Sequence, residues 1–131
     1  MTRTNLEERI DELLRKESPK DKEVATVLNR FGREYGSRID THVLLHEYPT
    51  RDGRATGISA TKEGIISWCE PGGMWTAYAS PEELKRMGTH ITSLGTDDIE
   101  DHLRRIRRDD GDAALKAVLQ QALRYITRGA R

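Results

Sequence analysis

The sequence predicts an α+β fold in one domain, residues 1–131, with helices at both ends and an antiparallel sheet between them. Apolar residues recur at helical spacing at both ends of the chain, whereas the middle alternates and is rich in β-branched and aromatic types. The middle segments are joined by short turns, which favour a meander without crossover helices. We therefore expect a helical pair over 4–35, a four-stranded antiparallel meander over 39–79, and C-terminal helices over 80–126 that pack on one sheet face.

The N-terminal helical pair is indicated by two apolar stripes on either side of a proline. Thr4 and Glu7 fit a capping box, which predicts a first helix over 4–17. Ser18 should cap a second helix over 19–35, because proline is favoured at the first helical position. The stripes consist of Leu6, Ile10, Leu13 and Leu14, and then of Val24, Val27, Leu28, Phe31 and Tyr35.

The first two strands of the meander are predicted from alternation and turn composition. Residues 39–48 alternate, and this pattern places His42 and His46 on the same face. A weaker strand of small residues is expected over 55–61. Lys62-Glu63-Gly64 then fits a turn with a glycine bulge.

The remaining two strands form a predicted hairpin over 64–80, with its turn at 70–73. A two-residue loop would place Trp68 opposite Trp75, and a three-residue loop would place it opposite Thr76; the sequence leaves both registers open. Core packing is the first interpretation of these tryptophans, since aromatic side chains dominate apolar burial in small domains. The second interpretation is that one of them is an exposed anchor for a partner.

Capping patterns divide the C-terminal part of the chain. Ser80-Pro81 with Glu83 should open a short helix that ends at Gly88. Residues 90–94 are interpreted as a fifth short strand or an extended linker. A helix over 96–109 begins with acidic residues and ends with arginines, which complements the helix dipole. Asp112 should cap a last helix whose apolar stripe is Leu115, Val118, Leu119, Ala122 and Ile126.

Composition limits the classes of function. The chain has 22 basic and 22 acidic residues, so its net charge is zero, which argues against a polyanion binder held by bulk charge. One cysteine allows no internal disulfide and suits a reducing compartment. No apolar run approaches the ~20 residues of a membrane span. We expect a cytoplasmic protein without contact to a membrane.

A search for catalytic and metal-binding patterns gives no strong candidate. His42 and His46 would be roughly 13 Å apart along a strand, which is too far for one metal ion. His46-Glu47 lacks the second histidine of a zinc-protease motif, because Thr50 stands at that position. Cys69 fits a half-buried strand cysteine. We therefore expect no catalytic residue, no metal site and no cofactor.

The first functional hypothesis is a small non-enzymatic module that binds and regulates another protein, as inhibitors or immunity proteins of mobile elements do. Its predicted contact surface consists of Trp68, Trp75, Tyr78 and Tyr48. A homodimer formed through an uncovered stripe of the terminal helices belongs to the same hypothesis.

Two other hypotheses come from the last helices. A nucleic-acid binder would use a face made of Arg104, Arg105, Arg107 and Arg108. The structural interpretation of the same arginines is a solvated helix end paired with Asp101, Asp109 and Asp110. A small hydrolase would use His102, with a pKa raised by the carboxylates around it, or His46 with Glu47.

Overall fold

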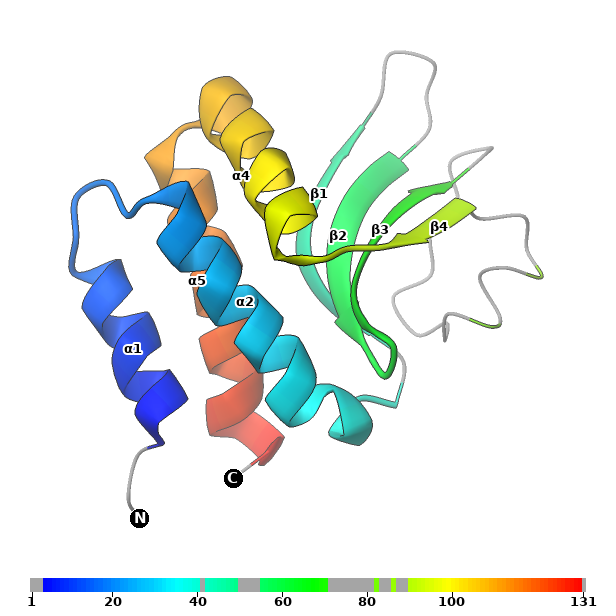
Figure 1. The fold of residues 1–131 in the computed structure, drawn as a ribbon, viewed down its shortest axis with the longest axis horizontal. Coiled ribbons are helices and arrows are strands. Elements are labelled where there is room, and N and C mark those ends of the chain that lie inside the picture. Colours follow the sequence, from blue (N-terminus) through cyan, green and yellow to red (C-terminus); the bar gives the residue numbers. More distant parts are fainter. Residues whose placement is uncertain are drawn as a thin grey trace.

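The computed structural model describes residues 4–40, 42–49, 55–70 and 90–130, together with Glu82 and Arg86. A layer of helices lies against one face of a four-stranded antiparallel sheet (Figure 1). The fold is α+β, as the sequence predicts. The elements are α1 (Asn5–Leu14), α2 (Asp21–Tyr35), the 3-10 turn η1 (Gly36–Arg38), β1 (Val43–Pro49), β2 (Ala55–Thr61), β3 (Gly64–Glu70), β4 (His90–Ser93), α4 (Thr96–Asp110), α5 (Asp112–Tyr125) and the π-helical turn η2 (Ile126–Ala130).

Helix α2 is the centre of the helical layer. It packs against β2 and β3, while α5 covers β1, α4 runs along α2, and α1 lies outside against α2 and α5 (Figure 1). The predicted apolar stripes form one continuous core because each faces its neighbours across these contacts. The fully buried members include Leu6, Ile10, Leu13, Val24, Leu28, Phe31, Leu115, Val118, Leu119 and Ala122.

The predicted start of α1 is confirmed, and the predicted start of α2 is wrong. Glu7 donates its backbone N–H to Thr4 Oγ1 at 3.1 Å, and Glu7 Oε1 accepts from the Thr4 N–H at 3.3 Å. Helix α2 begins two residues after Pro19, with Lys20 at its N-cap position and no side-chain cap. Ser18 Oγ instead donates to Asp112 Oδ1 at 3.0 Å. The hydroxyl predicted to cap α2 is therefore used in a contact with α5.

The sheet has the order β1-β2-β3-β4, with all neighbours antiparallel. The β2–β3 turn at Lys62-Glu63 is confirmed, and Gly64 follows it with φ of +97°, a conformation that favours glycine. The fourth strand is β4, the segment that the sequence leaves as strand or linker. Trp68 lies between Gly57 and Ile91 in the sheet.

The predicted hairpin is therefore corrected at β3. Its second strand lies outside the described residues. Because both edges of β3 are paired at Trp68, no edge remains there for the predicted pairing with Trp75 or Thr76. The short helix predicted over 80–88 also lies outside the described residues, apart from Glu82 and Arg86.

A β-bulge in β1 changes which residues share a face. Leu44 pairs with Ser59 and His46 pairs with Ile58, so Leu45 is an extra residue in β1. The bulge turns His46 towards the helices, whereas the His42 ring lies at Ser59 on the other face. The predicted common face for the two histidines is wrong, because alternation alone does not register an inserted residue.

The C-terminal helices agree with the predicted bounds except at one cap. Gly111, with φ of +86°, stands at the N-cap of α5, and Asp112 is the first helical residue rather than the cap. The carboxylate of Asp112 is engaged by Arg107 and Ser18. At the start of α4, Asp98 Oδ2 accepts from the Gly95 N–H at 3.0 Å. No helix in the described ranges is long and apolar enough to cross a membrane.

Candidate partner-binding site

Trp68 is a core residue and not an exposed anchor. Its side chain is 1% exposed, and its Nε1 donates to Ser59 Oγ at 3.0 Å. The indole covers Gly57 so closely that a Cβ there would lie 2.6 Å from Trp68 Cζ2. Trp68 and Ile66 alternate with Ile65, which packs on α2, so they lie on the sheet face away from the helices.

The other residues of the predicted aromatic surface are placed only in part. Trp75 and Tyr78 lie outside the described residues. Tyr48 is described as a backbone position in β1, opposite Thr56. Trp68 is thus the only one of the four predicted aromatic side chains that the structure describes, and the surface formed by the other three stays a prediction.

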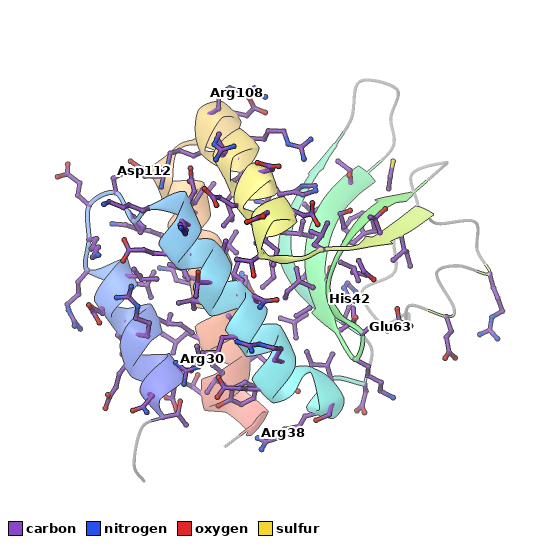
Figure 2. The ribbon with its side chains drawn as sticks, viewed as in Figure 1. Arg30, Arg38, His42, Glu63, Arg108 and Asp112 are labelled. Atoms are coloured by element: carbon purple, nitrogen blue, oxygen red, sulfur yellow. The ribbon has the colours of Figure 1, made fainter. Side chains whose placement is uncertain are left out.

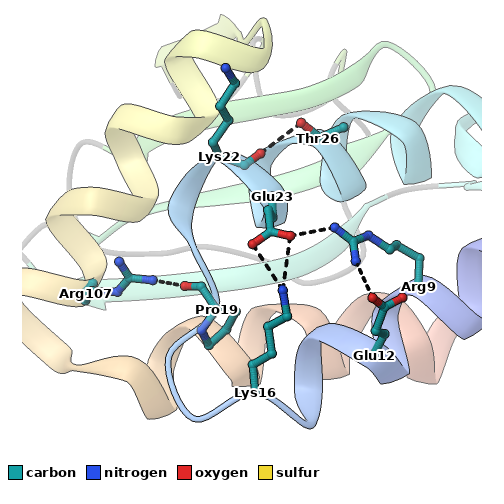
Figure 3. Close-up of polar contacts among 8 residues, drawn as sticks. All are labelled: Arg9, Glu12, Lys16, Pro19, Lys22, Glu23, Thr26 and Arg107. Atoms are coloured by element: carbon teal, nitrogen blue, oxygen red, sulfur yellow. Dashed lines mark hydrogen bonds and ion pairs between the residues drawn. The ribbon is translucent and has the colours of Figure 1, made fainter.

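The predicted arginine face is divided by Arg107, which forms contacts inside the protein. Its Nη1 lies 3.0 Å from Asp21 Oδ1, and its Nε lies 3.0 Å from Asp112 Oδ1. A further donor, Nη2, reaches the Pro19 carbonyl (Figure 3). Arg107 therefore joins α4 to α2 and α5 and does not belong to an exposed phosphate-binding face.

The remaining arginines of the run are exposed, and Arg108 lies at the outer end of α4 (Figure 2). With Asp101, they line a hollow of about 420 Å³. Arg104 pairs with Asp101 at 2.9 Å and with Glu100 at 3.2 Å, and Arg108 pairs with Asp109 at 3.1 Å. Carboxylates thus neutralise much of this face, as the structural interpretation predicts, although Asp110 lies 3.4 Å from His46 Nε2 instead.

The structure separates one of the two arrangements considered for a hydrolase, His46 with Glu47. Glu47 pairs with Gly57 on the face opposite to His46, so these neighbours in sequence point away from each other. Burial, followed by the charge of Arg105, lowers the pKa of His102, although Asp98 and Asp101 oppose this effect. The predicted rise in pKa is wrong. Among the residues that the structure describes, no group of three His, Cys, Asp or Glu side chains is placed to hold a metal ion.

A hollow of about 810 Å³ lies between α1 and α2 and is dominated by an ion-pair network. Glu23 Oε2 lies 2.7 Å from Arg9 Nη2 and 3.2 Å from Lys16 Nζ, and Arg9 also pairs with Glu12 at 2.9 Å (Figure 3). Hydrogen bonds from Arg9 and Lys16 lower the pKa of Glu23 below its ordinary value. The network ties α1 to α2 and gives these charges a structural role.

The lowered pKa of Glu23 predicts an acid-labile contribution to stability. A carboxylate with a lower pKa in the folded state stabilises the fold above its unfolded pKa, near 4.5, and this stabilisation is lost as pH falls through the folded pKa. Glu23→Gln should therefore flatten the pH dependence of urea denaturation below about pH 4.5. Glu12→Gln, which removes only the outer partner of Arg9, is the control. An unchanged pH profile in Glu23→Gln would contradict this role.

A third hollow, which the sequence did not indicate, lies between the end of α5 and β1. This α5–β1 groove has a volume of about 360 Å³ and is lined by His42, Val43, Gln121, Arg124, Tyr125 and Arg128. It exists because α5 packs on β1, so it brings together two segments that lie about 80 positions apart. The only local signal is the pair of arginines one turn apart on either side of a tyrosine.

The tyrosine of the α5–β1 groove is held in place. Tyr125 Oη donates to the Arg38 carbonyl at 3.1 Å, and its ring packs edge-on against Phe31 at 5.9 Å and Tyr35 at 6.5 Å between centroids. Burial, followed by the charge of Asp40, raises the pKa of its hydroxyl. Tyr125 therefore presents a fixed, half-buried aromatic wall.

The charge of the α5–β1 groove is one-sided. Its lining among the described residues contains Arg124 and Arg128 and no carboxylate. Neither arginine forms an ion pair with a described residue, whereas Arg9, Arg30, Arg104, Arg107 and Arg108 all do. In a chain of zero net charge, this leaves a small cationic concavity at one end of the helical layer.

Comparisons with protein-family models, with curated proteins and with solved structures give no match to this chain. The contacts and charges of its own residues are the basis for a functional proposal.

Proposed function

We propose that the chain is a small regulatory module that acts by binding a protein partner, with the α5–β1 groove as its contact surface. The observation that supports this is a concave surface that combines a held tyrosine with two arginines lacking described ion partners. Tyrosine and arginine are the residue types that most often dominate binding energy at interfaces. A pre-positioned ring also reduces the ordering cost of association.

The proposal keeps the class suggested by the sequence and changes the surface. Trp68 supports the sheet from within, so its role is to hold the fold and not to touch the partner. Trp75, Tyr78 and Tyr48 stay in the proposal as a second contact area. A cytoplasmic location belongs to the same proposal, and the single free cysteine, Cys69, is compatible with it.

The test is affinity capture of partners from extracts of the cells that produce the protein, followed by quantification of each captured protein. The variant Arg124→Glu/Arg128→Glu reverses the charge of the groove. Arg104→Glu/Arg105→Glu is the matched control, because it makes the same charge change at exposed positions of α4. Thermal melts should show that both variants remain folded.

The expected result is a partner that the wild type and the α4 variant retain and that the groove variant retains at least tenfold less. A tenfold loss corresponds to about 1.4 kcal/mol, well within the effect of removing two interface arginines. Equal retention of every captured protein by both variants would remove the groove from the proposal.

Nucleic-acid binding is the second proposal, and the shallow hollow beside Arg104, Arg105 and Arg108 is the observation that favours it. The same two variants test it against a DNA duplex. Binding that falls steeply with salt and is lost only in the α4 variant would support it. Binding that is absent, or insensitive to salt, would end it.

A further inference from the structure

The α5–β1 groove differs in charge from three other hollows formed by the described residues. The hollow between α1 and α2 contains Glu8, Glu12 and Glu23, the one along α4 contains Asp101, and the one beside the β2–β3 turn contains Glu63. Each of those sites carries its own counter-charge. In the α5–β1 groove, the described lining offers only cationic, amide and aromatic or apolar groups to a ligand.

We infer that the α5–β1 groove recognises side-chain carboxylates, so that its partner presents two acidic residues with one apolar residue between them. This inference rests on the proposed function and specifies the chemistry of the partner. The planar guanidinium groups of Arg124 and Arg128 match carboxylates, which they can bind through two parallel hydrogen bonds. The amide of Gln121 supplies a further donor in the same lining.

The position of the two arginines agrees with an anionic ligand. Arg124 lies in the last turn of α5 and Arg128 lies about one turn further on, in η2, where two like charges repel each other. The negative end of the helix dipole favours cations at this place and accounts for their charge. It does not account for the hollow between them and β1, which a bound carboxylate would occupy.

The walls of the groove favour an acidic peptide over a bare phosphate. Val43 and the ring of Tyr125 are apolar surfaces, and they make up much of the lining. A phosphate ion has no apolar group that could pack against these surfaces. A peptide with an apolar side chain between two acidic ones has such a group. Asp40 acts on the Tyr125 hydroxyl from outside the lining, together with Arg38, so the arginine side of the groove stays cationic.

The edge of β1 indicates that the partner binds through side chains. Strand β1 is one of the two edge strands of the described sheet, and it carries the bulge at Leu45. A bulge in an edge strand disturbs the row of backbone groups that an added strand would need. Recognition by Arg124, Arg128 and Gln121 requires no such addition.

The experiment uses the intact protein and a capped pentapeptide of alternating glutamate and leucine. Arginine Nε–Hε resonances are followed by ¹⁵N NMR during the titration and are assigned from the Arg124→Gln and Arg128→Gln variants. We expect saturable shifts of both resonances. Affinity should be at least tenfold weaker for the pentapeptide with glutamine in place of glutamate. In Arg124→Gln/Arg128→Gln, which lacks both reporter resonances, the backbone N–H resonance of Gln121 should show no saturable shift. Arg104→Gln/Arg105→Gln should bind like the wild type.

Three results would overturn the inference: equal binding of the glutamine peptide, tighter binding of inorganic phosphate than of the glutamate peptide, or equal shifts at Arg104 and Arg105. Its failure is distinguishable from failure of the proposed function. A groove-dependent protein partner with no response to the glutamate peptide would leave the function and remove its carboxylate chemistry. Saturable peptide binding without any groove-dependent protein partner would keep the carboxylate chemistry and remove the proposed function.

Discussion

Replacing Trp68 with alanine is expected to lower the free energy of unfolding by about 3–5 kcal/mol. The indole is almost fully buried, lies against the backbone of Gly57, and donates a hydrogen bond to Ser59. Its removal leaves a cavity over the sheet face at Gly57, and the strands beneath it are paired on both sides, so the backbone has little freedom to collapse into the cavity. Ser59 would also lose a partner in a buried position.

Urea denaturation followed by far-UV circular dichroism measures this loss. Trp68→Phe is the matched comparison, since it keeps an aromatic ring over Gly57 and removes the hydrogen bond to Ser59. It should cost clearly less than the alanine variant. A Trp68→Ala protein that unfolds within about 1 kcal/mol of the wild type would show that the sheet does not depend on this side chain.

Replacing Arg107 with alanine is expected to cost about 1.5–3 kcal/mol, the usual range for a hydrogen bond to a charged group. Arg107 is 29% exposed and reaches Pro19, Asp21 and Asp112 from the end of α4. Its loss would leave Asp21, which is 16% exposed, without the cation that faces it. Lysine at this position should restore only part of the loss, because it lacks the planar set of donors.

The neighbouring residue provides the control for this measurement. Arg108 is 71% exposed and pairs only with the adjacent Asp109 among the described residues. Arg108→Ala should therefore change the free energy of unfolding by no more than about 0.5 kcal/mol. Equal losses in Arg107→Ala and Arg108→Ala would contradict the structural role of Arg107.

The helices were predictable because the signals that define them are local. Apolar residues at 3.6-residue spacing predict the stripes that form the core, and the Thr4–Glu7 capping box lies within four residues. The caps assigned to Ser18 and Asp112 failed for the opposite reason. These two side chains bond each other across 94 positions, so a tertiary contact overrides each local preference.

The sequence predicts an antiparallel sheet, but it predicts the pairing of the strands only in part. Alternation and turn chemistry predict β1, β2 and β3 and the Gly64 turn. The bulge at Leu45 leaves no mark in an alternating pattern, and the choice of β4 as the neighbour of β3 depends on where the chain returns. Both features are set by contacts between distant segments.

The candidate site was the least predictable part. Arg124 and Arg128 stand near a chain end that the sequence marks only as the last helix, and Val43 belongs to the first strand. Nothing in either segment indicates a groove, because the groove is the space that remains where α5 crosses β1. Conversely, Arg107 belongs by sequence to a basic run, and in the structure it joins α4 to α2 and α5.

The last two helices complete the helical layer, and this affects how the chain folds during its synthesis. Helix α2 is synthesised early, yet α4 and α5 complete its burial, and Arg107 and Tyr125 reach back 88 and 87 residues to the carbonyls of Pro19 and Arg38. A nascent chain that stops at β4 would expose the apolar faces of α2 and β1. We therefore expect the helical core to be completed only after α5 has been synthesised, and the unfinished core to be a substrate for chaperones until then.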